Sequence, residues 1–133
     1  MDKYEVLEKA GAFQSDSDRI KHIDNELGEL EGRRVTVSYH LSELDFLKVQ
    51  ISAMEDKKKL IMIDEKIAYL EKERKIAELN SNIRIKQDRV SSDSRMYLAR
   101  LEFIEKRMKE LQGIRAIIVA NMHTNVDTPT AGE

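Results

Sequence analysis

Apolar residues in the first half of the chain recur at alternating steps of three and four residues. The series runs without interruption from Ile20 to Ile51, and eight of its ten positions are apolar. Its two polar positions are Arg34 and Lys48, whose long stems can lie along a seam while their charges reach water. A period of 3.5 residues is typical of a helix that packs against another helix. The pattern therefore predicts a first coiled-coil helix over residues 17–54.

One stretch inside this series also fits a strand. Residues 35–39, VTVSY, alternate between apolar and polar side chains, as a half-buried strand does. The helix is favoured because the series continues through the stretch and no turn signal follows it.

The series fails between residues 52 and 59, where MEDKKK stands before LIMI. Leu60, Ile63, Ile67 and Leu70 then form a new set, but the nine residues from Ile51 to Leu60 do not fit the earlier phase. Two interpretations are open. Either the helix turns at 55–59 and returns as the second arm of a hairpin, or it continues and its seam shifts by a stutter.

A second arm is predicted over residues 60–122. One line of apolar or Tyr residues repeats there every seven positions, from Met62 to Ile118. Its neighbouring seam positions are polar in the middle of the arm, at Asn80, Gln87 and Ser94. The SSDS stretch at 91–94 is a candidate break, because Ser and Asp favour helix caps over helix interiors.

The two ladders together define the side chains that we expect to form a self-association seam. They are Ile20, Ile23, Leu27, Leu30, Val37, Leu41, Leu44, Ile51, Leu60, Ile63, Ile67, Leu70, Ile76, Ile83, Val90, Tyr97, Ile104, Leu111 and Ile118.

Both ends of the chain carry candidate attachment residues. Residues 1–16 form a short amphipathic segment and a linker, in which Ser15 or Ser17 is expected to cap the next helix. Residues 113–122, GIRAIIVANM, are apolar on most faces, so a single neighbouring helix cannot cover them. Residues 123–133 form a polar tail that is expected to be disordered. The residues that we expect to bind a partner are Tyr4, Leu7, Phe13, Ile114, Ile117, Val119 and Met122.

Composition agrees with long helices rather than with a compact enzyme. Charged residues make up 36% of the chain and aromatic residues 5%, with no Trp and a single Pro. There is no cysteine, which excludes disulfides, thiolate catalysis and Cys-type zinc sites. The start of the chain lacks the apolar region of a secretion signal, and the apolar run near its end is too short to span a bilayer. We expect a cytoplasmic protein, or one within a particle assembled in the cytoplasm.

No pattern of catalytic or cofactor-binding residues is present. His22 and His40 each have a Glu within one helical turn, which supplies at most two metal ligands on one face. Phosphate-binding loops and nucleophile elbows are absent from the sequence. We therefore expect no enzyme activity, no metal and no cofactor.

Nucleic-acid binding is a stronger alternative to a structural role than catalysis or metal binding is. The candidate residues form one cluster and one looser stripe, which acidic residues such as Glu78 and Asp93 partly oppose. They are Lys57, Lys58, Lys59, Lys75, Lys86, Arg89 and Arg100. Gly28 and Gly32 also form a G-x-x-x-G pattern, which predicts either a close helix crossing or two tolerated glycines.

These patterns predict an all-α protein that forms an extended coiled coil or a long helical hairpin. In composition and length the chain resembles helical assembly proteins, such as the scaffolding and minor structural proteins of phage particles. The predicted function is that of a non-enzymatic, oligomeric structural or assembly protein that binds copies of itself and a larger protein assembly. The alternatives are a nucleic-acid-associated coiled coil and a holdase-like helical chaperone.

Overall fold

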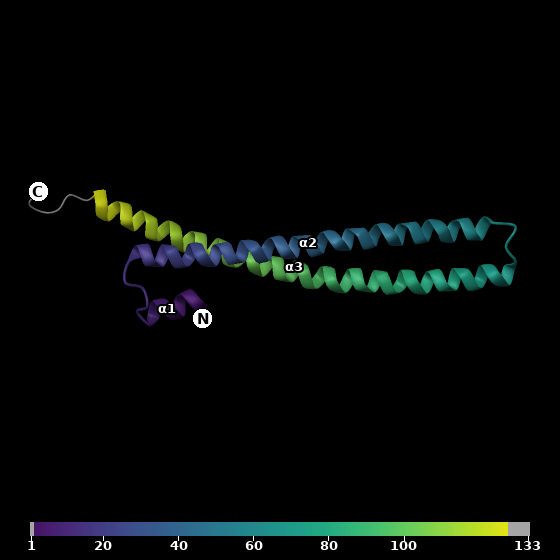
Figure 1. Ribbon diagram of the computed structural model, residues 1–133, viewed down its shortest axis with the longest axis horizontal. Coiled ribbons are helices and arrows are strands. Elements are labelled where there is room, and N and C mark those ends of the chain that lie inside the picture. Colours follow the sequence, from purple (N-terminus) through teal and green to yellow (C-terminus); the bar gives the residue numbers. More distant parts are fainter. Residues whose placement is uncertain (1, 128–133) are drawn as a thin grey trace, which may run out of the picture. The chain divides into compact units, whose positions relative to one another are not determined.

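A computed structural model describes residues 2–127, and side chains as far as Thr124. The described residues form three α-helices and no strand: α1 spans Lys3–Lys9, α2 spans Asp16–Ile63 and α3 spans Tyr69–Asp127 (Figure 1). The all-α prediction is therefore confirmed. Residues 35–39 lie inside α2, so the strand alternative is wrong.

The chain divides into two compact units, and both long helices contribute to each of them. Unit 1 comprises Met1–Val35 and Glu102–Glu133, and unit 2 comprises Thr36–Leu101. Unit 1 thus contains α1, the beginning of α2 and the end of α3. Unit 2 contains the rest of α2 and α3 and the turn that joins them.

In unit 2, α2 and α3 run side by side in opposite directions (Figure 1). Near the open end of this hairpin the rings of His40 and Tyr97 stack at a centroid distance of 5.1 Å. At its closed end Lys72 Nζ donates a hydrogen bond to the Met62 carbonyl oxygen at 3.2 Å. The hairpin interpretation of the sequence agrees with this arrangement.

The turn of the hairpin lies at residues 64–68 and not at 55–59, which are helical. Asp64 explains the position. Its carboxylate oxygen Oδ1 accepts a hydrogen bond from the Lys66 backbone N–H at 2.9 Å, and its carbonyl oxygen accepts one from the Ile67 N–H at 3.4 Å. Asp commonly bonds its own backbone two residues on, which offers the chain an alternative to the helix.

The continuous α3 corrects two further predictions. No break occurs at 91–94, where Asp93 Oδ2 lies 3.5 Å from Arg89 Nε, one helical turn away. The residues of the predicted tail from 123 to 127 are part of α3, and residues 128–133 lie outside the described range.

The seven-residue line of α3 faces the packed side of the hairpin from Ile76 onward. Its most buried members are Ile83 in unit 2 and Ile104, Leu111 and Ile118 in unit 1. The line does not extend back to Met62 and Tyr69, which are both exposed.

The packed face of α2 changes phase earlier than the sequence suggested. Leu44 is buried, but the next inward position is Leu47, because Lys48 is exposed. Further along, Ile61 is buried while Leu60 and Ile63 are exposed. Among the predicted seam residues, Leu60, Ile63 and Leu70 are therefore not part of the packing between α2 and α3. Ile61 lies ten residues after Ile51 and so continues the alternating steps of three and four residues, whereas Leu60 and Ile63 fall on another face of α2.

Ser15 and Gly11 determine how the chain enters α2 and leaves α1. Ser15 Oγ accepts a hydrogen bond from the Asp18 N–H at 3.1 Å, so the predicted cap of the first long helix is confirmed. Gly11 has φ of +70° and ends α1. Its N–H donates to the Glu8 carbonyl oxygen at 3.1 Å, and the Ala12 N–H donates to the Leu7 carbonyl oxygen at 3.0 Å. This is the Schellman arrangement, which satisfies the last carbonyl groups of a helix.

Gly28 and Gly32 do not mark a close helix crossing. A Cβ atom at either position would meet no atom within 4 Å, and both residues are exposed. The structure therefore favours the interpretation of two tolerated glycines.

Candidate functional site

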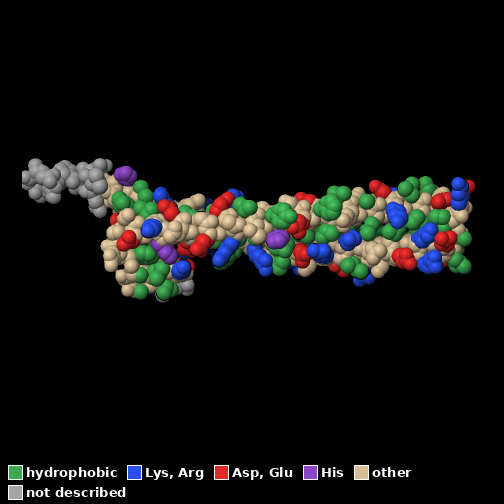
Figure 2. Space-filling model, in the orientation of Figure 1, with side chains coloured by type: hydrophobic (Ala, Val, Ile, Leu, Met, Phe, Trp, Pro, Cys, Tyr) green, Lys and Arg blue, Asp and Glu red, His purple; other side chains and the backbone are tan. Residues whose placement is uncertain are grey.

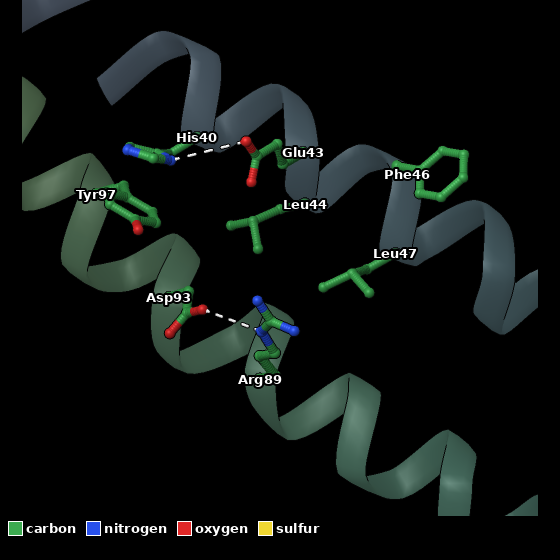
Figure 3. A pocket seen from close by; sticks show the side chains of 8 residues that line it. All are labelled: His40, Glu43, Leu44, Phe46, Leu47, Arg89, Asp93 and Tyr97. Carbon is green, nitrogen blue, oxygen red and sulfur yellow. Dashed lines mark ion pairs between the residues drawn. The ribbon is translucent and has the colours of Figure 1, made fainter. Parts of the chain in front are cut away.

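A groove in unit 2, with a volume of about 280 Å³, lies between α2 and α3. Its lining residues are His40, Glu43, Leu44, Phe46, Leu47, Arg89, Asp93 and Tyr97 (Figure 3). Leu44 and Leu47 face the space between the two helices, whereas the Phe46 ring points away from α3 (Figure 3).

Polar groups at the groove are arranged in neighbouring pairs. His40 Nδ1 lies 4.0 Å from Glu43 Oε1, and its ring stacks on Tyr97 with an interplanar angle of 15°. Arg89 pairs with Asp93 on the opposite helix. The lining includes no Ser, Thr, Cys or Lys that an adjacent base could activate as a nucleophile. The polar pairs of the groove border an apolar floor that Leu44 and Leu47 form.

The histidines do not gather ligands for a metal ion. Within the described range, no group of three or more His, Cys, Asp or Glu side chains is placed to hold one. His22 Nε2 lies 3.8 Å from Glu26 Oε2, which leaves two ligands on one helix face.

The N-terminal segment packs against its own chain. Tyr4 of α1 is buried, and its ring stacks on Phe13 at 5.4 Å and lies 6.2 Å from the His22 ring of α2. Phe13 also lies 5.3 Å from the His22 ring. Tyr4 and Phe13 therefore contact their own chain in this structure, and their binding to a partner stays a prediction. Leu7 is half-buried in the same unit.

Arg107, which the sequence did not single out, anchors this packing. It is the one charged side chain among the buried residues described, with 8% exposure. Its Nε donates to Glu26 Oε1 and its Nη1 to Asp2 Oδ2, both at 3.1 Å. Burial lowers the pKa of Arg107, but the Glu26 hydrogen bond and the charges of Glu26 and Asp2 raise it further, so the net shift is upward. The sequence signal for its burial is its spacing, since Arg107 lies three residues after Ile104 and four before Leu111, both apolar members of the line on α3.

The apolar end of α3 is only partly covered within unit 1. Ile118 is buried, and Ile114, Val119 and Met122 are half-buried. Ile117 is 64% exposed and is the strongest remaining candidate for attachment there.

Several of the candidate nucleic-acid residues already interact with side chains of the same chain. Lys75 Nζ lies 3.3 Å from Glu71, and Lys86 Nζ bonds Gln50 at 3.4 Å. The Arg100 guanidinium lies 5.8 Å from the Tyr97 ring centroid. The remaining cluster, Lys57–Lys59, has no ion pair within the described part of the chain.

A second apolar series on α2 is the clearest surface feature of unit 2. Its members follow steps of three and four residues, and all are exposed. We call it the outer stripe: Tyr39, Ser42, Phe46, Val49, Ala53, Asp56, Leu60 and Ile63. Six of these eight side chains are apolar, and the five large apolar ones are between 64% and 74% exposed. Figure 2 shows hydrophobic side chains at the surface of the hairpin, interleaved with charged ones.

The outer stripe can be found in the sequence, but the longer apolar series from Ile20 to Ile51 is the more evident pattern there. The stripe has the same 3.5-residue period as the packed face of α2, but its positions are offset by two residues and lie on the opposite side of the helix. Only the positions of α2 and α3 show which of the two series is covered.

Comparisons with protein-family models, curated proteins and solved structures found no match to this chain. None of the helices, as far as they are described, is both long and apolar enough to cross a membrane.

Proposed function

We propose that the protein is a non-enzymatic, oligomeric coiled-coil protein with a structural or assembly role. The outer stripe of α2 carries this proposal, because it adds a second helix-packing series to a helix whose other face already packs on α3. Large contiguous apolar surfaces on a protein commonly mark sites of association. A helix that only faced solvent would carry polar residues at these positions.

The distribution of buried side chains in unit 2 also supports association. Val37, Leu44, Ile61 and Ile83 are its buried apolar side chains, whereas more large apolar side chains are exposed in this unit than are buried. A thin two-helix core of this kind gains stability when further helices cover its outer faces.

We also propose that the protein attaches to a larger protein assembly, and the exposure of the apolar Ile117 on α3 supports this. The Ile117 side chain is 64% exposed and lies one helical turn from the half-buried Ile114, at the partly covered apolar end of α3. A role in a large particle, of the kind that the composition resembles, would use this surface together with the outer stripe.

The molar mass in solution tests the proposal. Sedimentation equilibrium over a range of concentrations is expected to give a mass that is a multiple of the 15.4 kDa chain. A fully helical protein that remains a monomer at every concentration would contradict the proposal. Circular dichroism on the same samples ensures that a low mass does not simply reflect unfolding.

A further inference from the structure

The outer stripe has the geometry of a coiled-coil seam that lacks its second helix. From Tyr39 to Ile63 its steps alternate between four and three residues over eight positions. The positions that face α3, such as Val37 and Leu44, are different ones. The stripe can therefore accept another helix while the hairpin of unit 2 remains intact.

Charged residues flank the stripe in an ordered way. Glu43 and Asp45 stand beside its first half, and Lys57 and Lys59 stand beside its second half. In coiled coils the residues that border the seam form ion pairs between helices and set their relative direction. Glu43 and Asp45 are thus opposite in charge to Lys57 and Lys59, while Asp56 within the stripe and Asp64 beside its end are acidic.

We infer that the outer stripe binds the outer stripe of a second copy of this chain, with the two α2 helices antiparallel. This inference rests on the proposed function and specifies its surface and its partner. When Val49 lies opposite Ala53 of the second copy, Tyr39 lies opposite Ile63. The same register places Glu43 beside Lys57 and Asp45 beside Lys59, and the twofold symmetry repeats each pair.

Existing contacts of the charged residues do not prevent this pairing. Asp45 Oδ1 lies 3.5 Å from Lys48, and Glu43 lies 4.0 Å from His40. Both are exposed pairs on one helix, a kind that contributes little to stability. Lys57 and Lys59, as described, form no ion pair and are free to accept these carboxylates.

A parallel pair in the same register is less favourable. It would place Asp56 of each copy opposite Asp56 of the other inside the seam, and like charges at close range repel. Its flanking residues would form only the pairs between Lys59 and Asp64. In the antiparallel pair Asp56 lies opposite Phe46, so its carboxylate must turn to the edge of the seam, but the two aspartates stay apart.

The aromatic side chains indicate that the interface is large enough to be specific. Each aromatic buries about 150–250 Å² when fully covered, so the four Tyr39 and Phe46 side chains of a pair, each about two-thirds exposed, offer roughly 500 Å². This is a large part of the roughly 1,200 Å² of the smallest specific interfaces, before the aliphatic side chains and the flanking charges are added.

Disulfide cross-linking tests the direction of the helices, because the chain has no cysteine of its own. The double variant Tyr39→Cys/Ile63→Cys is expected to form a covalent dimer on mild oxidation, while each single variant does not. Within one chain the two positions are about 36 Å apart at 1.5 Å per residue, so no internal disulfide competes. Covalent dimers of either single variant would indicate parallel helices and overturn the inference.

Charge reversal tests the ion pairs. Lys57→Glu/Lys59→Glu is expected to weaken dimerisation at least about tenfold in sedimentation equilibrium, and adding Glu43→Lys/Asp45→Lys is expected to restore it. Arg84→Glu/Arg95→Glu is the matched control, since it makes the same charge change on exposed positions of α3. Circular dichroism verifies that every variant remains helical.

The outcomes separate this inference from the proposed function. An oligomer that shows neither the double-variant cross-link nor the charge effect would overturn the inference and leave the proposed function standing. A helical monomer would overturn both. A monomer that binds DNA or RNA fragments in low salt, and loses this binding in Lys57→Glu/Lys59→Glu, would assign the lysines to nucleic acid instead.

Discussion

Gly11 shows how a single residue sets the path of the chain between α1 and α2. Its φ of +70° lies in the left-handed region, which residues with a Cβ rarely adopt. The two hydrogen bonds that close α1 depend on this conformation. Phe13, which stacks on Tyr4, lies two residues after Gly11 in the linker, so its position depends on the same turn.

Gly11→Ala is therefore expected to lower the free energy of unfolding by about 1–2 kcal/mol. Chemical denaturation measures this change. Gly28→Ala is the matched control with the opposite sign, since Gly28 is helical with open space around its Cβ position, and Ala is favoured over Gly inside helices by up to about 1 kcal/mol. Equal effects of the two substitutions would contradict the proposed role of Gly11.

At the scale of elements, α1 packs against the long helices of unit 1 through the apolar side chain of Tyr4 and the charged side chain of Asp2. Tyr4 supplies the packing, and Asp2 supplies the charge as the N-cap that also bonds Arg107. Burial raises the pKa of Asp2, but the hydrogen bond from the Glu5 N–H and the charge of Arg107 lower it more, so its pKa lies below the ordinary 3.8. The charged carboxylate is thus favoured in the folded chain.

This shift predicts that α1 loosens in acid. A carboxylate with a lowered folded-state pKa contributes stability above its unfolded pKa, and the contribution is lost as the pH falls through the folded pKa. Signals of the Val6 and Leu7 methyl groups in NMR spectra are expected to move toward unfolded positions below about pH 4. In Asp2→Asn, which keeps a good N-cap, this change is expected to be smaller. Glu8, whose pKa is lowered by its hydrogen bond with Arg19, supplies the remainder.

At the scale of the whole molecule, stability and association are expected to be linked. A ligand or partner that binds only the folded state raises its apparent stability by mass action. If copies associate through the outer stripe, each tenfold increase in protein concentration is expected to raise the Tm by about 2–4 °C. Differential scanning calorimetry measures the slope. Lys57→Glu/Lys59→Glu is expected to flatten it, whereas a slope of zero in the unaltered protein would contradict association.

Sequence patterns alone predicted the helical class, a serine cap at Ser15 or Ser17, and an inward line on α3, of which the part from Ile76 is confirmed. These features depend on local hydrogen bonding and on a period that a helix imposes by itself. The position of the turn was not predicted correctly, because the failed ladder at 55–59 was a stronger signal than Asp64, whose effect depends on competition between local bonds and the helix.

The tertiary structure was needed to show that Tyr4 and Phe13 pack within unit 1, that Arg107 is buried, and that one of two apolar series on α2 is exposed. A heptad pattern states that a face favours another helix, but it does not state which helix covers it. That assignment depends on where α3 lies, since burial is a property of the packed pair and not of either helix alone.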